Sequence, residues 1–169
     1  MIPSRRGPIR EKPHRLPREC YRGEVTTAIT ACVDRDVPLF NDCQVVNAFI
    51  ERLERAAKKH GCIVLIYCFM PEHQHLILRG ATPEADGWRA MVDSKQLTGF
   101  WLGRHRPEVD WQRSFYDHII RADEDLGAQI RYVADNPVRR GLVKQWRDHP
   151  YTGSIGIDLA TVIADTATL

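Results

Sequence analysis

Residues 62–78 have the sequence CIVLIYCFMPEHQHLIL, in which Pro71 and Glu72 separate two apolar runs. The first run, residues 62–70, is apolar on both faces and too short for a typical helix, which indicates a strand in the interior of a sheet. The second run, residues 73–78, follows so closely that we expect the two strands to pair antiparallel. This hairpin should form the centre of a sheet.

The segments before the hairpin predict a strand followed by a helix. Residues 24–33 are rich in β-branched side chains, which favours a strand. Residues 45–57 carry apolar side chains at helical spacing, so we expect a helix with one face in the core. Asn41 or Asp42 can cap its beginning, and Gly61 can end it.

The segments after the hairpin predict a helix over residues 86–103, a strand over residues 115–120, and a third helix that begins at Asp123 and ends before Pro137. The complete order contains a βαββαβ core. This core is typical of a ferredoxin-like α+β fold, in which helices cover one face of an antiparallel sheet, and here an extra C-terminal helix follows it. Beyond Tyr151 the pattern is too weak to assign an element.

Composition indicates a single globular domain of the cytoplasm. The chain has 169 residues, of which 43% are hydrophobic. This is enough for one domain with its own hydrophobic core but too short for two domains of ordinary size. The longest apolar stretch is too short to span a bilayer, and no secretory segment follows the first residues, so we expect no membrane contact. The five cysteines are scattered without a C-x-x-C pair, which favours a reducing compartment.

Residues 1–20 form a basic segment that contains four prolines. A flexible arm of this kind can lie along nucleic acid, because each phosphate contact releases counterions. A solvated tail is an equally good interpretation of the composition. The candidates for DNA contacts in this arm are Arg5, Arg6, Arg10, Lys12 and Arg15.

Two histidines begin the second strand of the hairpin. His73 and His75 occupy positions i and i+2, so their imidazoles lie side by side on one face of the sheet. Neutral histidine is the commonest metal ligand among side chains, which makes the pair a candidate divalent-metal site. Two partly exposed strand histidines are the alternative, but polar rings inside an apolar hairpin need a reason.

Tyr132 and Asn136 lie one turn apart in the predicted third helix. The amide oxygen of Asn136 could complete a metal site begun by the histidines, with Tyr132 beside it. Each residue also has an ordinary alternative: a tyrosine packed at the surface, and an asparagine at a helix C-terminus. Taken singly, the ordinary alternatives are the better ones.

Three ordered blocks of sequence resemble the single-tyrosine HUH transposases. They are FMPEHQHL at 69–76, WQRSFYDHIIR at 111–121 and RYVADNPVRRGLV at 131–143. Glu72 and Asn136 make the chain most similar to the REP-associated tyrosine transposase branch of that family. The likeness runs from about Tyr21 to Ser154.

The resemblance divides the chain into three parts. It implies an HUH nuclease domain over residues 21–154, between the basic arm of residues 1–20 and a C-terminal tail of residues 155–169. The expected fold is the ferredoxin-like sheet, with the extra helix carrying the nucleophile.

The resemblance also implies metal-dependent cleavage of single-stranded DNA. His73, His75 and Asn136 would hold Mg²⁺ or Mn²⁺, which polarises the scissile phosphate. Tyr132 would attack that phosphate and form a 5′-phosphotyrosine, from which another 3′-hydroxyl can displace it and join the strands. Tyr116, on the predicted strand of the second block, is the alternative nucleophile. The implied activity is that of an endonuclease and strand transferase.

Other residues of the matched blocks have weaker candidate roles. His118 could touch phosphate or hold a catalytic group, and a structural hydrogen bond is an equal alternative. Arg139, Arg140 and Lys144 suit a track for the DNA backbone, although a solvated basic face is the usual interpretation.

The expected partner is single-stranded or hairpin DNA, including repetitive extragenic palindromes, bound by a monomer or homodimer near the nucleoid. A non-catalytic hairpin-binding relative of the same fold is the main alternative. Against it, the four candidate site residues are all present. A ferredoxin-like RNA-binding module would need paired surface aromatic residues on its strands, and these are not evident.

Overall fold

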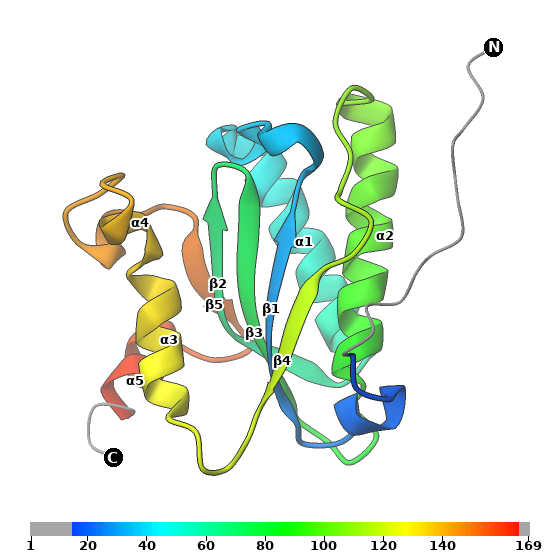
Figure 1. Ribbon diagram of the computed structural model, residues 1–169, viewed down its shortest axis with the longest axis vertical. Helices are drawn as coiled ribbons and strands as arrows, with labels where there is room; N and C mark the ends of the chain where they lie inside the picture. The colour runs from blue at the N-terminus through cyan, green and yellow to red at the C-terminus, as the bar shows by residue number, and fades with distance from the viewer. Residues whose placement is uncertain (1–14, 166–169) are drawn as a thin grey trace.

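The computed structural model describes residues 15–165, which form three layers with an antiparallel sheet in the middle (Figure 1). The strands are β1 (Thr26–Cys32), β2 (Cys62–Met70), β3 (His73–Gly80), β4 (Tyr116–Ile120) and β5 (Thr152–Ile155). Their order across the sheet is β4-β1-β3-β2-β5, and each neighbouring pair is antiparallel. The first four strands have the ferredoxin-like arrangement, so the predicted fold class is confirmed.

The predicted hairpin is central to this sheet. β2 pairs with β3 from Met70↔His73 at the turn to Cys62↔Gly80 at the other end. β1 pairs with the other side of β3, which leaves β4 and β5 at the two edges. The hairpin therefore places the two histidines next to the turn, between neighbouring strands on both sides.

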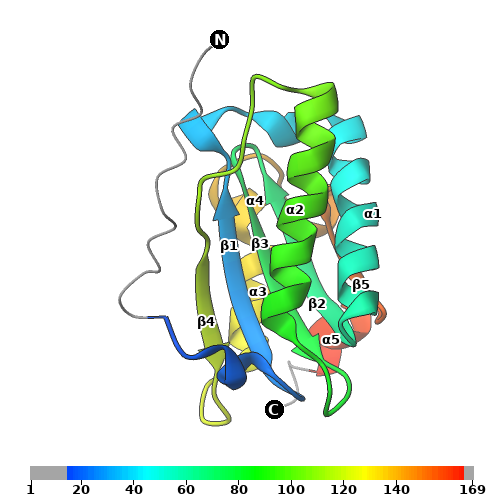
Figure 2. The ribbon, with the colours of Figure 1, turned by 90° about the vertical axis from the view of Figure 1, so that its right-hand side faces the viewer.

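Two long helices cover one face of the sheet (Figure 2). α1 (Cys43–Lys59) begins at Asp42, whose side chain accepts a hydrogen bond from the backbone of Gln44, and Gly61 follows it with a φ of 66°. α2 (Gly87–His105) begins at Asp86 in the same way. The core below these helices contains a cluster of aromatic rings, Phe40, Phe49, Phe69 and Trp111.

Shorter helices pack on the opposite face (Figure 1). They are α3 (Leu126–Ala134), α4 (Asn136–Arg139) and α5 (Leu159–Asp165). Ile130 and Val133 of α3 meet Ile66 and Ile77 of the central strands in a second apolar cluster. β2 is thus buried on both faces, which explains why the first strand of the hairpin lacks polar alternation.

The boundaries of the third predicted helix differ from the expectation. The N-cap is Asp125, which accepts a hydrogen bond from the backbone of Ala128, and not Asp123. α3 ends at Ala134, and Pro137 stands in the first turn of α4, where its missing N–H costs nothing. Asn136 therefore begins a new helix instead of ending the old one.

The C-terminal region is more ordered than its weak pattern suggested. β5 adds to the free edge of β2, and α5 places Leu159 and Val162 in the second apolar cluster. The segment assigned as a tail from residue 155 therefore contributes to the core.

The chain also has short 3-10 helices: Arg18–Tyr21, Asp34–Asp36, Leu39–Asn41 (η3) and Trp146–Asp148. Among the described residues, no helix is both long and apolar enough to cross a membrane.

Candidate active site

The side chains of His73 and His75 converge at the turn end of β3. Their Nε2 atoms lie 3.0 Å apart, and the rings stand nearly perpendicular, with an interplanar angle of 87°. Two ligands at neighbouring corners of an octahedral Mg²⁺ site, about 2.1 Å from the ion, are about 3 Å apart. The separation of the two nitrogens therefore fits a shared cation.

Outer partners orient both rings. Thr30 Oγ1 lies 2.9 Å from His75 Nδ1, and Glu72 Oε1 lies 3.2 Å from His73 Nδ1. Each ring thus uses Nδ1 for a protein contact and turns Nε2 toward the other ring. This is the usual arrangement of metal-binding histidines, in which the second nitrogen fixes the tautomer.

The surroundings keep both imidazoles neutral. Burial lowers the pKa of His75 to about 4, and the charges of His73 and Arg139 act in the same direction. Burial also lowers the pKa of His73, although the neighbouring Glu72 opposes the shift. A neutral imidazole keeps the lone pair that a metal ion requires.

An ion pair ties α4 to the hairpin. Arg140 donates a hydrogen bond to Glu72, the residue that also holds His73. The carboxylate of Glu72 is largely covered, with 20% of its side chain exposed. The C-terminal end of α4 is therefore held next to Glu72, the neighbour of His73.

Arg139 connects the two other predicted site residues. Its Nη2 donates to Asn136 Oδ1 at 2.6 Å, and its Nη1 donates to the carbonyl oxygen of Tyr132 at 3.1 Å. Its guanidinium carbon also lies 3.8 Å from the centre of the Tyr132 ring. Tyr132 is 61% exposed, so its ring is open to a substrate.

Asn136 has the features of an incomplete polar site. Its Nδ2 atom is buried without a hydrogen-bond partner, while its oxygen is occupied by Arg139. In the part of the chain that the structure describes, no group of three or more histidine, cysteine, aspartate and glutamate side chains could hold a metal ion. A third protein ligand next to the histidines would have to be of another type, such as an amide oxygen.

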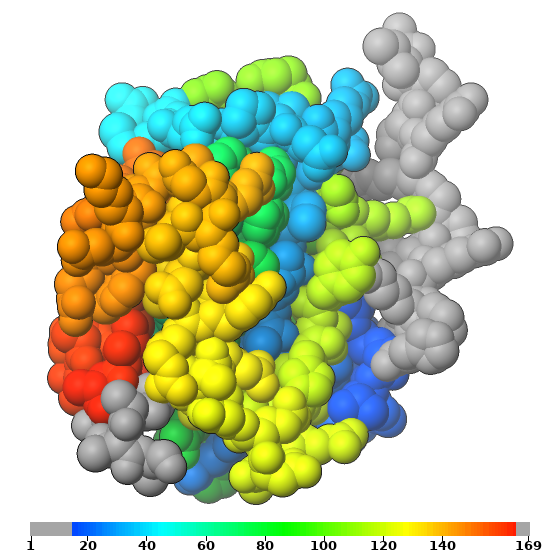
Figure 3. All heavy atoms as spheres, turned by 60° about the vertical axis from the view of Figure 1, so that its left-hand side comes forward, coloured from blue at the N-terminus to red at the C-terminus, as the bar shows by residue number. Residues whose placement is uncertain are grey.

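The sheet face beside the histidines is partly open. Figure 3 shows β1, in blue, at the bottom of a recess between α3, in yellow, and β4, in yellow-green. Thr30 and Ala28 on this strand are only half-buried, in keeping with that recess. A single strand of nucleic acid could reach the candidate site along this surface.

Tyr116 and His118 lie on β4, at the far side of the recess. Tyr116 pairs in register with Thr30, which in turn pairs with His75, so Tyr116 is two strands from the histidines, or about 10 Å. His118 Nε2 lies 2.7 Å from Glu124 Oε2. The latter carboxylate also accepts a hydrogen bond from the backbone of Arg121, which makes His118 part of the turn before α3.

The structure describes some of the predicted DNA contacts and not others. Arg139 and Arg140 lie at the candidate site, and Lys144 is exposed beyond it. Four residues of the arm, Arg5, Arg6, Arg10 and Lys12, lie outside the described residues.

Arg15 differs from its predicted role. Its Nε donates to Asp117 Oδ1 at 2.8 Å, and its guanidinium lies against the rings of Trp88 and Phe115, at 4.3 and 4.6 Å. Tyr21 also donates to Asp117. With 13% of its side chain exposed, Arg15 anchors the chain to β4 and is not available to phosphate.

Sequence reasoning missed two residues of the site. Thr30 lies on another strand, and only the register of β1 against β3 brings it to His75. Glu72 was noted for its likeness to one branch of a family and not for its contacts with His73 and Arg140.

Comparison with known proteins gives two curated relatives, and no family model matches the chain. A REP-associated tyrosine transposase of Haemophilus influenzae is 28% identical over 120 residues, which cover 63% of this chain and 67% of the relative. The REP-associated tyrosine transposase of Escherichia coli is 34% identical over 90 residues, 49% of this chain and 48% of the relative. The matches thus span about two thirds and about half of the relatives' lengths.

A solved structure has the same fold. The REP-associated tyrosine transposase bound to a REP hairpin superposes with a TM-score of 0.69 at 22% identity, over 85% of this chain and 82% of that chain. At this identity the likeness concerns the fold.

Proposed function

We propose that the chain is a REP-associated tyrosine transposase like the relatives it resembles, and that it acts as a metal-dependent endonuclease and strand transferase for single-stranded DNA. Its substrate would be DNA at or near a hairpin. The structural neighbour was solved with a REP hairpin, which supports this class of partner.

One observation carries the proposal. The Nε2 atoms of His73 and His75 converge at 3.0 Å beside a helix junction that bears both Tyr132 and Asn136. The pair between Glu72 and Arg140 holds that junction against the hairpin. A histidine pair that could hold a metal ion and an exposed tyrosine on adjoining elements are the parts that a phosphotyrosine mechanism needs.

The residues present fit a divalent cation, Mg²⁺ or Mn²⁺. His73, His75 and the amide oxygen of Asn136 would hold it, and its charge would polarise the scissile phosphate. The amide oxygen of Asn136 has two lone pairs, so it could bind the cation with one while it accepts from Arg139 with the other. Thr30 and Glu72 would keep both imidazoles oriented throughout.

Tyr132 would perform the covalent step. Its hydroxyl oxygen forms a bond to phosphorus while the bond from phosphorus to the 3′ oxygen breaks. The phenol gives up its proton, and the departing 3′ oxygen gains one, so the products are a 5′-phosphotyrosine and a 3′-hydroxyl. Because the phosphotyrosine is a phosphodiester, attack by another 3′-hydroxyl reverses the step and joins strands without a nucleotide cofactor.

A labelled single-stranded hairpin tests the function. Incubation with the protein should give a nick in the presence of Mg²⁺ or Mn²⁺ and none in the presence of a chelator. Binding without a nick under either condition would instead favour the non-catalytic hairpin-binding alternative.

A further inference from the structure

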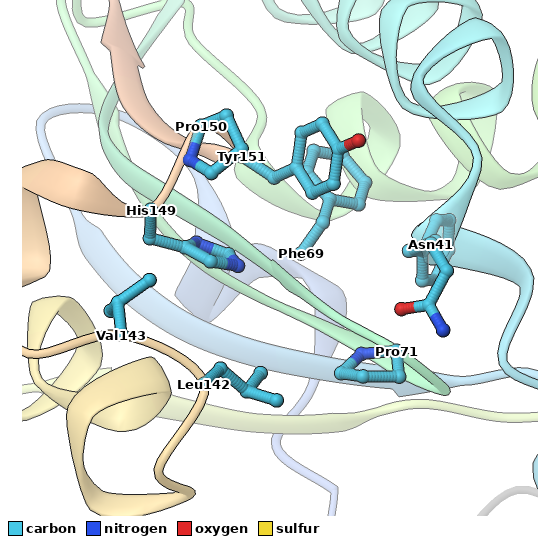
Figure 4. Close-up of a pocket in the computed structure, with 9 residues that line it drawn as sticks. Asn41, Phe69, Pro71, Leu142, Val143, His149, Pro150 and Tyr151 are labelled. Atoms are coloured by element: carbon cyan, nitrogen blue, oxygen red, sulfur yellow. The ribbon is translucent and has the colours of Figure 1, made fainter.

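A pocket of about 190 Å³ lies at the end of the sheet where β2 leads into the hairpin turn (Figure 4). Its walls include Asn41, Phe69, Pro71, Leu142, His149 and Tyr151. These residues come from η3, from the hairpin and from the segment that follows α4. None of them belongs to the candidate active site, although Pro71 precedes His73 by two positions.

A chain of polar contacts links His149 to the central strands. Thr152 Oγ1 donates to Cys68 Sγ at 3.3 Å, and Cys68 Sγ donates to Met70 Sδ at 3.8 Å. Thr152 Oγ1 also lies 2.8 Å from His149 Nδ1, and when the hydroxyl donates to Cys68 its oxygen accepts from that nitrogen. The proton of the ring is then on Nδ1, and Nε2 is a hydrogen-bond acceptor.

The ring of His149 extends toward the interior of the pocket (Figure 4). Burial lowers the pKa of this histidine, which keeps the ring neutral and the lone pair of Nε2 available. The carboxamide of Asn41 lies across the same space and can both donate and accept. The pocket therefore offers polar groups at fixed positions.

The rest of the wall is apolar and includes flat rings. Phe69 and Tyr151 are neighbours in it, and Leu142 remains 46% exposed at the opening. Aromatic and apolar walls with a few fixed hydrogen-bonding groups are the surroundings in which proteins hold unpaired bases. The space suits one planar ring system and is too small for a base pair.

The register of the sheet puts Thr152, beside the pocket, near the candidate active site, while Phe69 faces the opposite side of the sheet, which α1 covers. Thr152, the partner of His149, pairs with Cys68, and Cys68 pairs with His75. Thr152 and His75 are therefore two strands apart, or about 10 Å. A strand of DNA whose phosphate lies at the histidines can place a nearby base at this end of the sheet.

We propose that this pocket receives one unpaired nucleobase of the DNA strand, which donates a hydrogen bond to Nε2 of His149. The proposal rests on the proposed function, since it assumes a single strand bound at His73 and His75. It assigns to the pocket the selection of a base close to the cut.

A scan with abasic sites tests the proposal. Fluorescence polarisation would measure the affinity for a labelled hairpin with single-stranded flanks, in which each flanking nucleotide in turn lacks its base. For the wild type, removing the base at one position near the cut should lower the affinity about fivefold to 100-fold. This is the range of one base–aromatic contact. At that position, an analogue that keeps the ring but lacks N–H donors should lower it about two- to tenfold.

Two variants link that position to the pocket. Leu142→Trp fills the opening, and Asn41→Ala removes the amide from an exposed side chain, so neither should prevent folding. Both should bind the intact strand more weakly. In Leu142→Trp the abasic site should then cost nothing more, whereas in Asn41→Ala, which keeps the other walls and His149, its effect should be smaller than in the wild type but not lost. Asn47→Ala, an exposed asparagine on α1, should behave like the wild type.

Each outcome bears on the proposal. An abasic effect that is equally large in the wild type and in Leu142→Trp would overturn the assignment of the pocket, as would the lack of any sensitive position. If metal-dependent nicking persisted in that case, the proposed function would stand without the pocket. A failure to bind single-stranded DNA at all would overturn both.

Discussion

The guanidinium of Arg139 lies 3.8 Å from the centre of the Tyr132 ring and also donates a hydrogen bond to the side chain of Asn136. One cation thus restrains the proposed nucleophile and a proposed metal ligand together. The same charge acts on His75, which places Arg139 close to the histidine pair as well. Such a position suits a group that stabilises negative charge on a phosphate or a phenolate.

Replacing Arg139 should therefore slow the covalent step more than it weakens binding. In Arg139→Ala, the rate of adduct formation in single-turnover reactions should fall by about 100-fold, the usual effect of removing one charged donor from a reacting phosphate. Arg104→Ala is the matched control, because Arg104 also stacks on an exposed ring, Phe100, but lies on α2. Equal rates for the two variants would show that Arg139 only packs against the tyrosine.

Removing one histidine of the pair should abolish nicking while leaving hairpin binding nearly intact. His73→Ala and His75→Ala each lose a nitrogen ligand, so we expect activity to fall by more than about 100-fold, beyond the effect of removing an outer partner of a ligand. Titration calorimetry with Mn²⁺ should show the loss of binding directly. His105→Ala, at the end of α2, is the control, and full nicking by either variant of the pair would exclude these residues from the site.

The low pKa of His75 predicts a pH-dependent stability of the metal-free protein. In the unfolded chain this ring takes up a proton near pH 6.5, but in the fold its pKa is about 4. Between these values the unfolded state binds more protons, so the free energy of unfolding should decrease as the pH falls from 6.5 toward 4, by at most about 3 kcal/mol for this group.

Urea unfolding in the presence of a chelator measures this effect. As the pH falls through that range, the free energy of unfolding should decrease more for the wild type than for His75→Gln, which lacks the titrating ring. Parallel pH profiles for the two proteins would contradict the assigned shift.

The anchor formed by Arg15 predicts a second effect on stability. Arg15→Ala leaves the covered carboxylate of Asp117 without its cation and removes contacts with Trp88 and Phe115. We expect the free energy of unfolding to fall by about 3 kcal/mol, as when one partner of a buried ion pair is removed. Arg18→Ala, whose guanidinium is 6.0 Å from the Trp88 ring, should change it far less. Equal values for the two variants would mean that Arg15 is a surface residue after all.

Local sequence signals predicted most of the individual elements. Periodicity and capping chemistry are enough to predict α1 and its two ends, because the signals lie within one stretch of the chain: the cap at Asp42, the apolar stripe of the helix and the Gly61 that follows it. The same holds for the hairpin and for the two histidines on one face of β3. The helix end predicted from Pro137 is wrong because a proline that ends one helix is also favoured at the start of the next.

The site could be predicted only in part, because its outer contacts are not local. Thr30 reaches His75 through strand pairing, and Arg140 reaches Glu72 across 68 positions of the chain. Arg15 is another case: its charge suggested DNA, and only the fold shows that Asp117 and two rings enclose it. Charge alone does not distinguish a phosphate contact from an internal ion pair.

The most direct test of the account is to map the covalent link between the protein and DNA. After reaction with a labelled single-stranded hairpin and Mg²⁺, a denaturing gel should show an adduct on the 5′ side of the cut, and peptide mapping should place it on Tyr132. Tyr132→Phe removes one exposed hydroxyl and little packing, so it should bind DNA normally but form no adduct, no nick and no joined product. An adduct on Tyr116, or nicking by Tyr132→Phe without any adduct, would contradict the assignment.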